Sequence, residues 1–599
     1  MESEIISPPE SGKYWWYYRG LLLLVTLFAF FPALQCGYIR WDDPAMILDN
    51  PFFHDLSISS LMNLFTKPYQ NLYQPLTILS LAIDSHFAGE DFFIFHFTNI
   101  LFHLFNVLLV FELAKRLGMT LTSSFFVALL FAIHPSRVDS VAWITERKDV
   151  LFTFFYLLGL VIHMRAPASA SRNPRKLVVF CFMLSIMSKF SAISFPFVLA
   201  IIDRKQYGTS FVEWGKRAWS FFLVILLLCL VTIGSWGSVL NPLPGDEYPT
   251  GGLLLRSLRV IFGVGVMVRH IIWPTDIPLQ IPFLLPSFSE WPVEKLSWGV
   301  CAVFLCICLY WSRRLKSVQF GLCFFLVALI PVHASIFMLP TMGKEFTAIR
   351  HAYLPAFGLF FALVAFLQHL FSSVDDHIRQ KIRIGMIALS LAGFGYMMHI
   401  TRDRCGWYDD NLTFWSKVIS QNPNVYAFIN RGKAYFSSGR FMEARDDFLQ
   451  LTRLIPDDQR GWIGLAAAEL NLGHPDKVQS LMEKARKKWP DSPQVYEYLG
   501  LAAANASRTE EAIGYYSEAL RLNQKYLAAW YNRSVAFRNR GSQDLALSDI
   551  EKVLSIDPDN SPTLLLKADI LEAQGLVEKA REIRSRVTQG RSVAVTPEP

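Results

Sequence analysis

Apolar runs separated by short polar connections fill residues 1–400 of this 599-residue chain. Several approach the roughly 20 residues that a bilayer-spanning helix needs. They predict eleven helices, at residues 17–36, 95–114, 121–137, 149–164, 177–188, 190–203, 218–238, 297–312, 318–336, 353–371 and 384–400. The pattern therefore predicts a polytopic transmembrane domain over residues 1–400. Residues 253–274 are apolar but carry Arg256, Arg259 and Arg269, which predicts an interfacial helix and leaves a buried or re-entrant one as the alternative.

Lys and Arg cluster in every second connection, as at residues 115–116 and 313–316. The positive-inside rule places these connections and the N-terminus in the cytoplasm. Because the predicted number of crossings is odd, the first long loop and the C-terminal part are expected on the extracytoplasmic face. That face is the periplasmic side of a bacterial inner membrane, or the lumen of the endoplasmic reticulum in a eukaryote.

Beyond residue 400 a polar, helical pattern repeats every 34 residues. Copies begin at residues 424, 458, 492 and 526, and a partial fifth copy runs to about 588. Small residues mark two positions where paired helices should touch, namely Gly432, Ala466, Gly500, Ser534 and Ala568, and then Ala444, Ala512, Ala546 and Ala580. This tetratricopeptide signature predicts an all-α solenoid over residues 424–588, after a connector at 401–423 and before a disordered tail at 589–599.

Composition agrees with a membrane protein, since 52% of the residues are hydrophobic and the mean hydropathy is +0.29. The net charge of +7 is distributed over loops and predicts no nucleic-acid partner. Only Cys36 and Cys405, of eight cysteines, lie outside apolar runs. Their spacing predicts neither a disulfide framework nor a zinc site.

The extracytoplasmic loops collect charged residues that orientation alone does not require. Asp42 and Asp43 follow the first helix, and the other loops add Glu146, Arg147, Lys148, Asp149, Lys189, Arg350 and His351. Charged groups at a bilayer edge are by default candidates for function. Carboxylates can take a proton from an acceptor hydroxyl, and cations can bind a phosphate leaving group. We therefore predict Asp42, Asp43, Glu146 and Asp149 as catalytic, and Arg147, Lys148, Lys189, Arg350 and His351 as donor-phosphate ligands.

Several stretches resemble the GT-C superfamily of polytopic glycosyltransferases, and within it the transmembrane-and-tetratricopeptide O-mannosyltransferases and their bacterial relatives. They are "WDDPAMILDNP", "YQPLTILSLAID", "LLFAIHPSRVDSVAWITERKDVLFTFFYLL" and "RHAYLPAFGLFFAL". The resemblance implies a GT-C-like fold, a polyprenyl- or dolichyl-phosphate sugar donor, mannose or a similar hexose as the sugar, and protein hydroxyls as acceptors. Relatives often read Asp-Arg-Tyr in the last motif, where this chain has Ile349, Arg350 and His351.

Other interpretations stay open. The paired aspartates could cap a helix, residues 146–149 could form a solvated turn, Lys189 could extend to the interface, and Arg350 with His351 could be structural. The chain could instead be a ligase that uses a glycan on lipid pyrophosphate, or a membrane-anchored scaffold without catalysis. No metal site is predicted, although a divalent cation could join a carboxylate to the phosphate. The repeats could recruit the protein acceptor or serve as a spacer.

Overall fold

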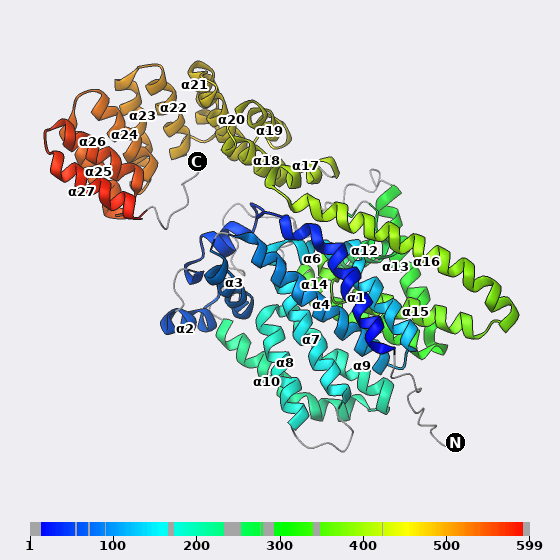
Figure 1. Ribbon diagram of the computed structural model, residues 1–599. Coiled ribbons are helices and arrows are strands. Elements are labelled where there is room, and N and C mark those ends of the chain that lie inside the picture. Colours follow the sequence, from blue (N-terminus) through cyan, green and yellow to red (C-terminus); the bar gives the residue numbers. More distant parts are fainter. Residues whose placement is uncertain are drawn as a thin grey trace. The chain divides into compact units, whose positions relative to one another are not determined.

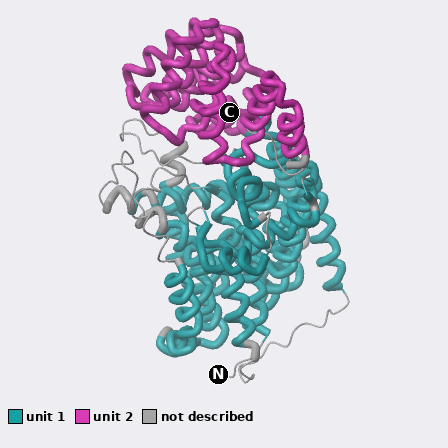
Figure 2. Tube along the Cα trace, turned by 90° about the vertical axis from the view of Figure 1, so that its left-hand side faces the viewer, with its two compact units in different colours: residues 1–414 teal, residues 415–599 magenta. Residues whose placement is uncertain are grey.

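The computed structural model describes residues 14–53, 57–69, 72–89, 91–165, 173–232, 253–275, 277–279, 293–338, 348–421 and 423–590. Within these ranges the chain is helical, and its β pairing is limited to an isolated bridge between Tyr69 and Leu72. The all-α prediction is therefore confirmed. The chain divides into two compact units, residues 1–414 and 415–599, drawn in teal and magenta in Figure 2.

The N-terminal unit is built from long helices joined by short 3₁₀ or π segments (Figure 1). Its first part contains α1 (Trp15–Phe30), η1 (Phe31–Gln35), η2 (Pro44–Leu48), η3 (Pro51–Phe53), α2 (Ile58–Thr66), α3 (Pro75–Ala88), α4 (Phe92–Arg116), α5 (Leu121–Ile133), η4 (Pro135–Arg137), α6 (Val138–Ala142), η5 (Ile144–Glu146), α7 (Arg147–Arg165), α8 (Asn173–Ser188), η6 (Phe190–Ser194), α9 (Phe195–Tyr207) and α10 (Phe211–Thr232). The second part contains α12 (Leu253–Ile272), α13 (Val293–Trp311), η9 (Ser312–Arg314), α14 (Lys316–Met338), η11 (Ile349–Ala352), α15 (Ala356–Ser372), α16 (Asp376–Cys405) and η12 (Gly406–Tyr408).

Fewer helices meet the requirements of a membrane span than the sequence predicts. In the described residues, four are long and apolar enough, and a bent pair raises the number to five; they are Trp15–Gln35, Phe92–Arg116, Val212–Val231 and Lys316–Ala334, with Leu121–Ile133 plus Pro135–Ala142 as the pair. This corrects the prediction of about eleven spans. The predicted segments are largely helical where the structure describes them, and residues 233–238 of the segment 218–238 lie outside the described ranges. However, α8 and α9 have only 16 and 13 residues, and α7 begins with three charged residues. Short or charged helices do not match the apolar thickness of a bilayer.

Helix α12 occupies the segment that we predicted to lie at the interface. Its residues Val266, Met267, Val268 and His270 are buried, and it contacts both α13 and α14. An interfacial helix would present a broad polar face to water. The packing therefore favours the alternative of a helix buried within the bundle.

Helices α14 and α15 touch through two glycines. A Cβ atom added to Gly321 would lie 2.5 Å from the carbonyl oxygen of Gly358, and one added to Gly358 would lie 2.4 Å from that of Gly321. Side chains cannot occupy such a gap, so small residues let the two backbones approach. This contact fixes α15, whose preceding segment η11 carries two of the candidate site residues.

The C-terminal unit consists of α17 (Asn411–Gln421), which begins before the unit boundary, followed by five helix pairs. The pairs are α18 (Val425–Ser437) with α19 (Phe441–Leu454), α20 (Gln459–Asn471) with α21 (Pro475–Lys488), α22 (Pro493–Asn505) with α23 (Thr509–Leu522), α24 (Leu527–Asn539) with α25 (Gln543–Ile556), and α26 (Ser561–Ala573) with α27 (Val577–Gly590). The small positions predicted at helix contacts are confirmed. Ala466 and Ala512 are fully buried, and a Cβ atom on Gly500 would lie 2.4 Å from the Tyr516 ring.

Candidate functional site

Asp43 anchors the loop that follows α1. Its carboxyl group is buried, and its Oδ2 atom accepts a 2.7 Å hydrogen bond from the backbone N–H of Ile39. Its Oδ1 atom accepts from the indole Nε1 of Trp143 at 2.9 Å and from the hydroxyl of Thr145 at 2.7 Å. Asp43 precedes η2, but its side chain does not cap that helix. The residue instead ties the loop to the segment between α6 and α7.

Burial raises the pKa of Asp43 to about 6, because removal from water disfavours the charged form. The hydrogen bonds from Ile39, Thr145 and Trp143 act in the opposite direction, and the neighbouring charge of Asp42 adds to the rise. Both oxygens of Asp43 already have donors. The geometry therefore suits a positioning role better than proton transfer from a substrate.

Asp42 lies in a different environment from its neighbour. Its side chain is half-buried, and no hydrogen bond or ion pair within the described ranges engages its carboxylate. Its negative charge nevertheless contributes to raising the pKa values of Lys148 and Arg350, against the lowering that burial causes. Asp42 is thus a carboxylate with available oxygens whose charge acts on two cations of the site.

Glu146, Lys148 and Arg350 form one buried charged group. Oε1 of Glu146 lies 3.2 Å from Nζ of Lys148 and 2.9 Å from Nε of Arg350. Burial raises the pKa of Glu146. The surrounding cations Lys148, Arg350 and Lys189 together lower it by more, so the pKa lies below its usual value. The guanidinium of Arg350 also stacks over the Trp143 ring at 5.2 Å. The Glu146 side chain is fully buried, whereas those of Lys148 and Arg350 are 17% and 15% exposed, so the group keeps its charges while it is largely removed from water.

Buried Asp149 and partly exposed Lys189 form a second ion pair next to the first. Nζ of Lys189 donates to Oδ1 of Asp149, and the hydroxyl of Ser140 donates to Oδ2 at 3.0 Å. Lys189 also contributes to lowering the pKa of His351 well below its usual value, after the larger effect of burial. These contacts bring Asp149, Lys189 and His351 into the same charged cluster as Glu146.

Arg147 points away from that cluster. Its guanidinium donates to Oδ1 of Asn99, to the Ser80 hydroxyl at 2.8 Å, to Oδ2 of Asp84 at 2.6 Å and to the carbonyl of Phe95 at 2.8 Å. Each of its nitrogens therefore has an acceptor. Of the nine predicted site residues, Arg147 is the one that the structure holds in a separate network joining α3, α4 and α7.

Several buried polar atoms in the cluster lack a hydrogen-bond partner in the described part of the chain. They are both carboxylate oxygens of Glu146, Nε and Nη1 of Arg350, and Nδ1 of His351. The ion pair between Glu146 and Arg350 is close but is not aligned as a hydrogen bond. Buried polar atoms are almost always paired in folded proteins. Unpaired donors at this position are suited to an anionic ligand.

Residues that the sequence analysis did not single out hold this cluster in place. Arg137 donates to the carbonyl oxygens of Tyr353 and, at 3.2 Å, Ala352, which fixes η11. Asp139 accepts from Nη2 of Arg404 at 2.8 Å and from the Tyr408 hydroxyl at 2.8 Å, which fixes the end of α16. Both Arg137 and Asp139 stand in the same "HPSRVD" stretch, but their distant partners could not be read from it.

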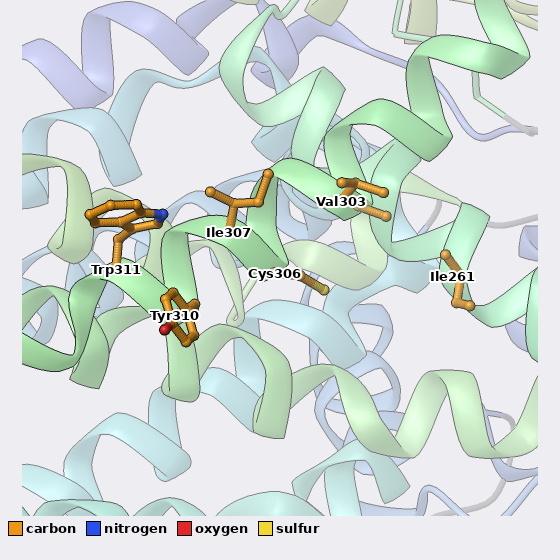
Figure 3. A pocket seen from close by; sticks show the side chains of 7 residues that line it. Ile261, Val303, Cys306, Ile307, Tyr310 and Trp311 are labelled. Atoms are coloured by element: carbon orange, nitrogen blue, oxygen red, sulfur yellow. The ribbon is translucent and has the colours of Figure 1, made fainter.

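Neither a metal centre nor the pocket along α13 competes with this site in the described residues. No group of three or more His, Cys, Asp or Glu residues in the described ranges could hold a metal ion. A pocket of about 450 Å³ lies along α13 and is lined by Ile261, Ala302, Val303, Cys306, Ile307, Tyr310 and Trp311 (Figure 3). Its lining contains no carboxylate or amine for acid–base chemistry. The charged cluster therefore remains the candidate site.

Both halves of the chain are similar to known proteins. A family model described as "Tetratricopeptide repeat" matches residues 429–477, 468–526 and 506–561. "Protein O-mannosyl-transferase TMTC3" of Mus musculus is 23% identical over 91% of this chain and 64% of its own length. "Protein O-mannosyl-transferase F38B6.6" of Caenorhabditis elegans is 22% identical over 75% of this chain and 64% of its own length. The predicted resemblance to the transmembrane-and-tetratricopeptide O-mannosyltransferases is confirmed.

The chain spans less than two thirds of the length of the relatives that it matches. "Protein O-mannosyl-transferase TMTC3" of Homo sapiens is 22% identical over 90% of this chain, and the match covers 64% of the length of that relative. A crystal structure of MamA covers 27% of the chain and 94% of its own length at 21% identity, with a TM-score of 0.23, which is too low to bear on the fold. The tetratricopeptide repeats are confirmed, and the relatives are named as O-mannosyl-transferases.

Proposed function

We propose that this chain is a membrane glycosyltransferase that moves mannose or a similar hexose from a polyprenyl phosphate to hydroxyl groups of proteins. The observation that carries the proposal is the charged cluster, in which Glu146 lies 3.2 Å from Lys148 and 2.9 Å from Arg350, the charge of Asp42 acts on both cations, and buried donors lack partners. Relatives named as O-mannosyl-transferases support the same reaction class. The donor, the acceptor and the inverting course of the reaction are part of the proposal.

The cationic side of the cluster binds the donor phosphate. Arg350 offers Nε and Nη1, and His351 offers its ring Nδ1. Guanidinium groups bind phosphate through paired, charge-assisted hydrogen bonds. Lys148 and Lys189 add positive charge nearby, while Glu146 and Asp149 keep the cations from repelling one another before the donor arrives. Negative charge that grows on the leaving phosphate is then stabilised by groups that need no rearrangement.

The acidic side of the cluster activates the acceptor. Asp42 has available oxygens, whereas those of Asp43 are occupied by Ile39, Trp143 and Thr145. In the proposed step, the acceptor oxygen bonds to the anomeric carbon, its proton goes to Asp42, and the sugar–phosphate bond breaks. One displacement gives inversion without a covalent intermediate on the protein. Asp43 positions Asp42 by holding the loop.

The arrangement of basic residues supports an extracytoplasmic site. Glu112, near the end of α4, pairs with Arg19 at 3.2 Å, Lys115 at 2.9 Å and Arg116 at 2.6 Å. This basic group and the charged site lie toward opposite ends of α4, because Arg147 reaches Asn99 near its start. With 25 residues, α4 extends about 37 Å, enough to cross a bilayer. If the basic end is cytoplasmic, the site faces the opposite side.

Reconstitution of the purified protein in lipid vesicles tests the function. A polyprenyl-phosphate mannose labelled in the sugar is supplied with proteins from the extracytoplasmic compartment, and labelled products are identified by mass spectrometry. We expect transfer to Ser or Thr hydroxyls. Glycan transfer only from a lipid pyrophosphate would support the ligase instead, and no transfer from either donor would support a scaffold. Parallel reactions with and without a divalent-cation chelator decide whether a metal takes part.

A further inference from the structure

The two cysteines that stand outside the apolar runs meet in the structure. Cys36 follows η1 at the end of α1, and Cys405 is the last residue of α16. Both are free thiols and both are buried. The Sγ atom of Cys36 lies 3.3 Å from the carbonyl oxygen of Cys405. The fold therefore joins residues near the two ends of the N-terminal unit.

Hydrogen bonds just beyond the two cysteines hold the two segments together. The N–H of Gly37 donates to the carbonyl oxygens of Tyr408 at 3.2 Å and Asp409 at 3.1 Å. Asn411 accepts a 2.6 Å hydrogen bond from the N–H of Arg40 and donates to a carbonyl in the same loop. A Cβ atom on Gly37 would lie 3.0 Å from the Asp409 carbonyl oxygen. The loop after α1 is thus packed directly on the end of α16.

We infer that Cys36 and Cys405 are joined by a disulfide bond in the mature protein. Bonds of about 1.2 to 1.5 Å keep a carbonyl oxygen close to the Cβ atom of its own residue. The Cys36 sulfur therefore lies against residue Cys405, and the Cys405 thiol adds to the rise in the pKa of Cys36 that burial mainly causes. The six remaining cysteines lie in apolar helices, so this pair has no competing partner in the same loops.

The bond requires an external oxidant, which we identify by class as a thiol–disulfide oxidoreductase. One cysteine thiolate attacks the disulfide of that protein and forms a mixed disulfide; the second thiolate then displaces the oxidoreductase sulfur. The sulfur–sulfur bond is formed, both thiol protons are released, and the oxidoreductase leaves as a dithiol with two electrons. Such oxidants act on the extracytoplasmic side, so the inference rests on the proposed orientation of the site.

A bond at this place would restrain the loop that holds the candidate base. Asp42 lies six residues beyond Cys36 in the same loop, and Asp43 is held to Ile39 of that loop. The end of α16 is in turn fixed to the core, because Arg404 pairs with buried Asp139. Linking Cys36 to Cys405 would therefore tether the Asp42 loop to the same framework through covalent bonds.

Peptide mapping of the full-length protein tests the inference. Membranes are solubilised without reductant in denaturing detergent with a thiol-blocking maleimide, and the protein is digested. We expect a peptide in which Cys36 is linked to Cys405, while Cys306 carries the maleimide. Maleimide on both Cys36 and Cys405 in the unreduced sample would overturn the proposal. Sugar transfer measured on the same membranes distinguishes the disulfide from the proposed function. Transfer in a sample that lacks the linked peptide refutes only the disulfide.

Thermal stability provides a second measurement that does not depend on peptide recovery. Reductant should lower the melting temperature of the wild-type protein by several degrees and leave that of a Cys36→Ser/Cys405→Ser variant unchanged. A Cys301→Ser/Cys306→Ser variant, altered in α13, is the matched control and should respond to reductant like the wild type. An equal response of the wild-type protein and the Cys36→Ser/Cys405→Ser variant would contradict the disulfide.

Discussion

Nε of Arg350 lies 2.9 Å from Oε1 of Glu146, which joins η11, just before α15, to η5, just before α7. The contact is an ion pair without an aligned hydrogen bond, so both buried groups retain unused hydrogen-bonding capacity. Arg350 also stacks over the Trp143 ring, and Arg137 holds the backbone of the segment that carries Arg350. This relationship makes the cluster a binding site candidate instead of a closed structural network.

The two neighbouring aspartates should respond differently to removal of their charge. Asp42→Asn should reduce sugar transfer about 10²- to 10⁴-fold, because the base is lost, and should leave the melting temperature unchanged. Asp43→Asn should lower unfolding free energy by about 1 to 3 kcal/mol, since its new amide N–H faces the N–H of Ile39 or another donor. Transfer assays and melting curves measure both effects. Parental transfer by Asp42→Asn would remove Asp42 from the mechanism.

Arg350 should act on the donor more than on the acceptor. Loss of a charged hydrogen-bonding group typically costs about 1.5 to 3 kcal/mol, or roughly 10- to 150-fold in affinity. We expect Arg350→Gln to raise the KM for the polyprenyl-phosphate sugar by this factor while the KM for the protein acceptor stays constant. Arg350→Lys keeps the charge but loses the planar fork, so its effect should be intermediate. Equal changes in both KM values would indicate a general structural defect.

Burial of Asp43 should make stability depend on pH. Its folded pKa of about 6 lies above the ordinary value of 3.8, so the folded state binds the proton more tightly than the unfolded state. The resulting stabilisation is fully present below about pH 4 and is lost as the pH rises through about 6, with a span of about 3 kcal/mol. The advantage of the wild-type protein over Asp43→Asn should therefore be larger at pH 4.5 than at pH 7.5. A difference in stability between the two proteins that is the same at both pH values would contradict this assignment.

The tetratricopeptide repeats should affect the choice of acceptor and not the chemistry. A chain ending after Gln421 should retain donor binding and slow donor hydrolysis but glycosylate proteins poorly, because recruitment raises the local concentration of the acceptor. Exchange of the repeats for those of a relative should change which proteins are modified. Quantitative glycoproteomics measures both results. Unchanged modification of the same proteins by the shortened chain would leave the repeats a role as spacer or assembly module.

The orientation of the chain can be tested by thiol labelling. In a background with exposed native cysteines replaced, a membrane-impermeant reagent added outside should modify Lys477→Cys, which lies in the repeats. It should reach Ser210→Cys, in the connection between α9 and α10, only after the membrane is opened. The reverse pattern of protection would place the site and repeats in the cytoplasm. Labelling of both positions from outside would require a different path of the chain through the membrane.

The sequence by itself determined the helical elements and the repeats, because both depend on local periodicity. Apolar runs predicted the helices of the N-terminal unit, and small residues at a period of 34 predicted the paired helices that begin at residues 425, 459, 493, 527 and 561. The number of membrane spans was overestimated, since hydrophobicity also marks short helices that pack inside the unit, such as α9. Charged residues in the predicted extracytoplasmic loops indicated the candidate site.

Only the tertiary structure decided which partners the charged residues contact. Asp42 and Asp43 are adjacent and chemically identical in the sequence, but Asp43 points to Trp143 and Thr145 while Asp42 keeps its oxygens available. Arg147 and Lys148 are likewise adjacent, yet Arg147 turns to Asp84 and Lys148 to Glu146. Successive residues on a helix point in directions about 100° apart, so neighbours in the chain reach different partners. Those partners come from distant segments, and folding alone brings them together.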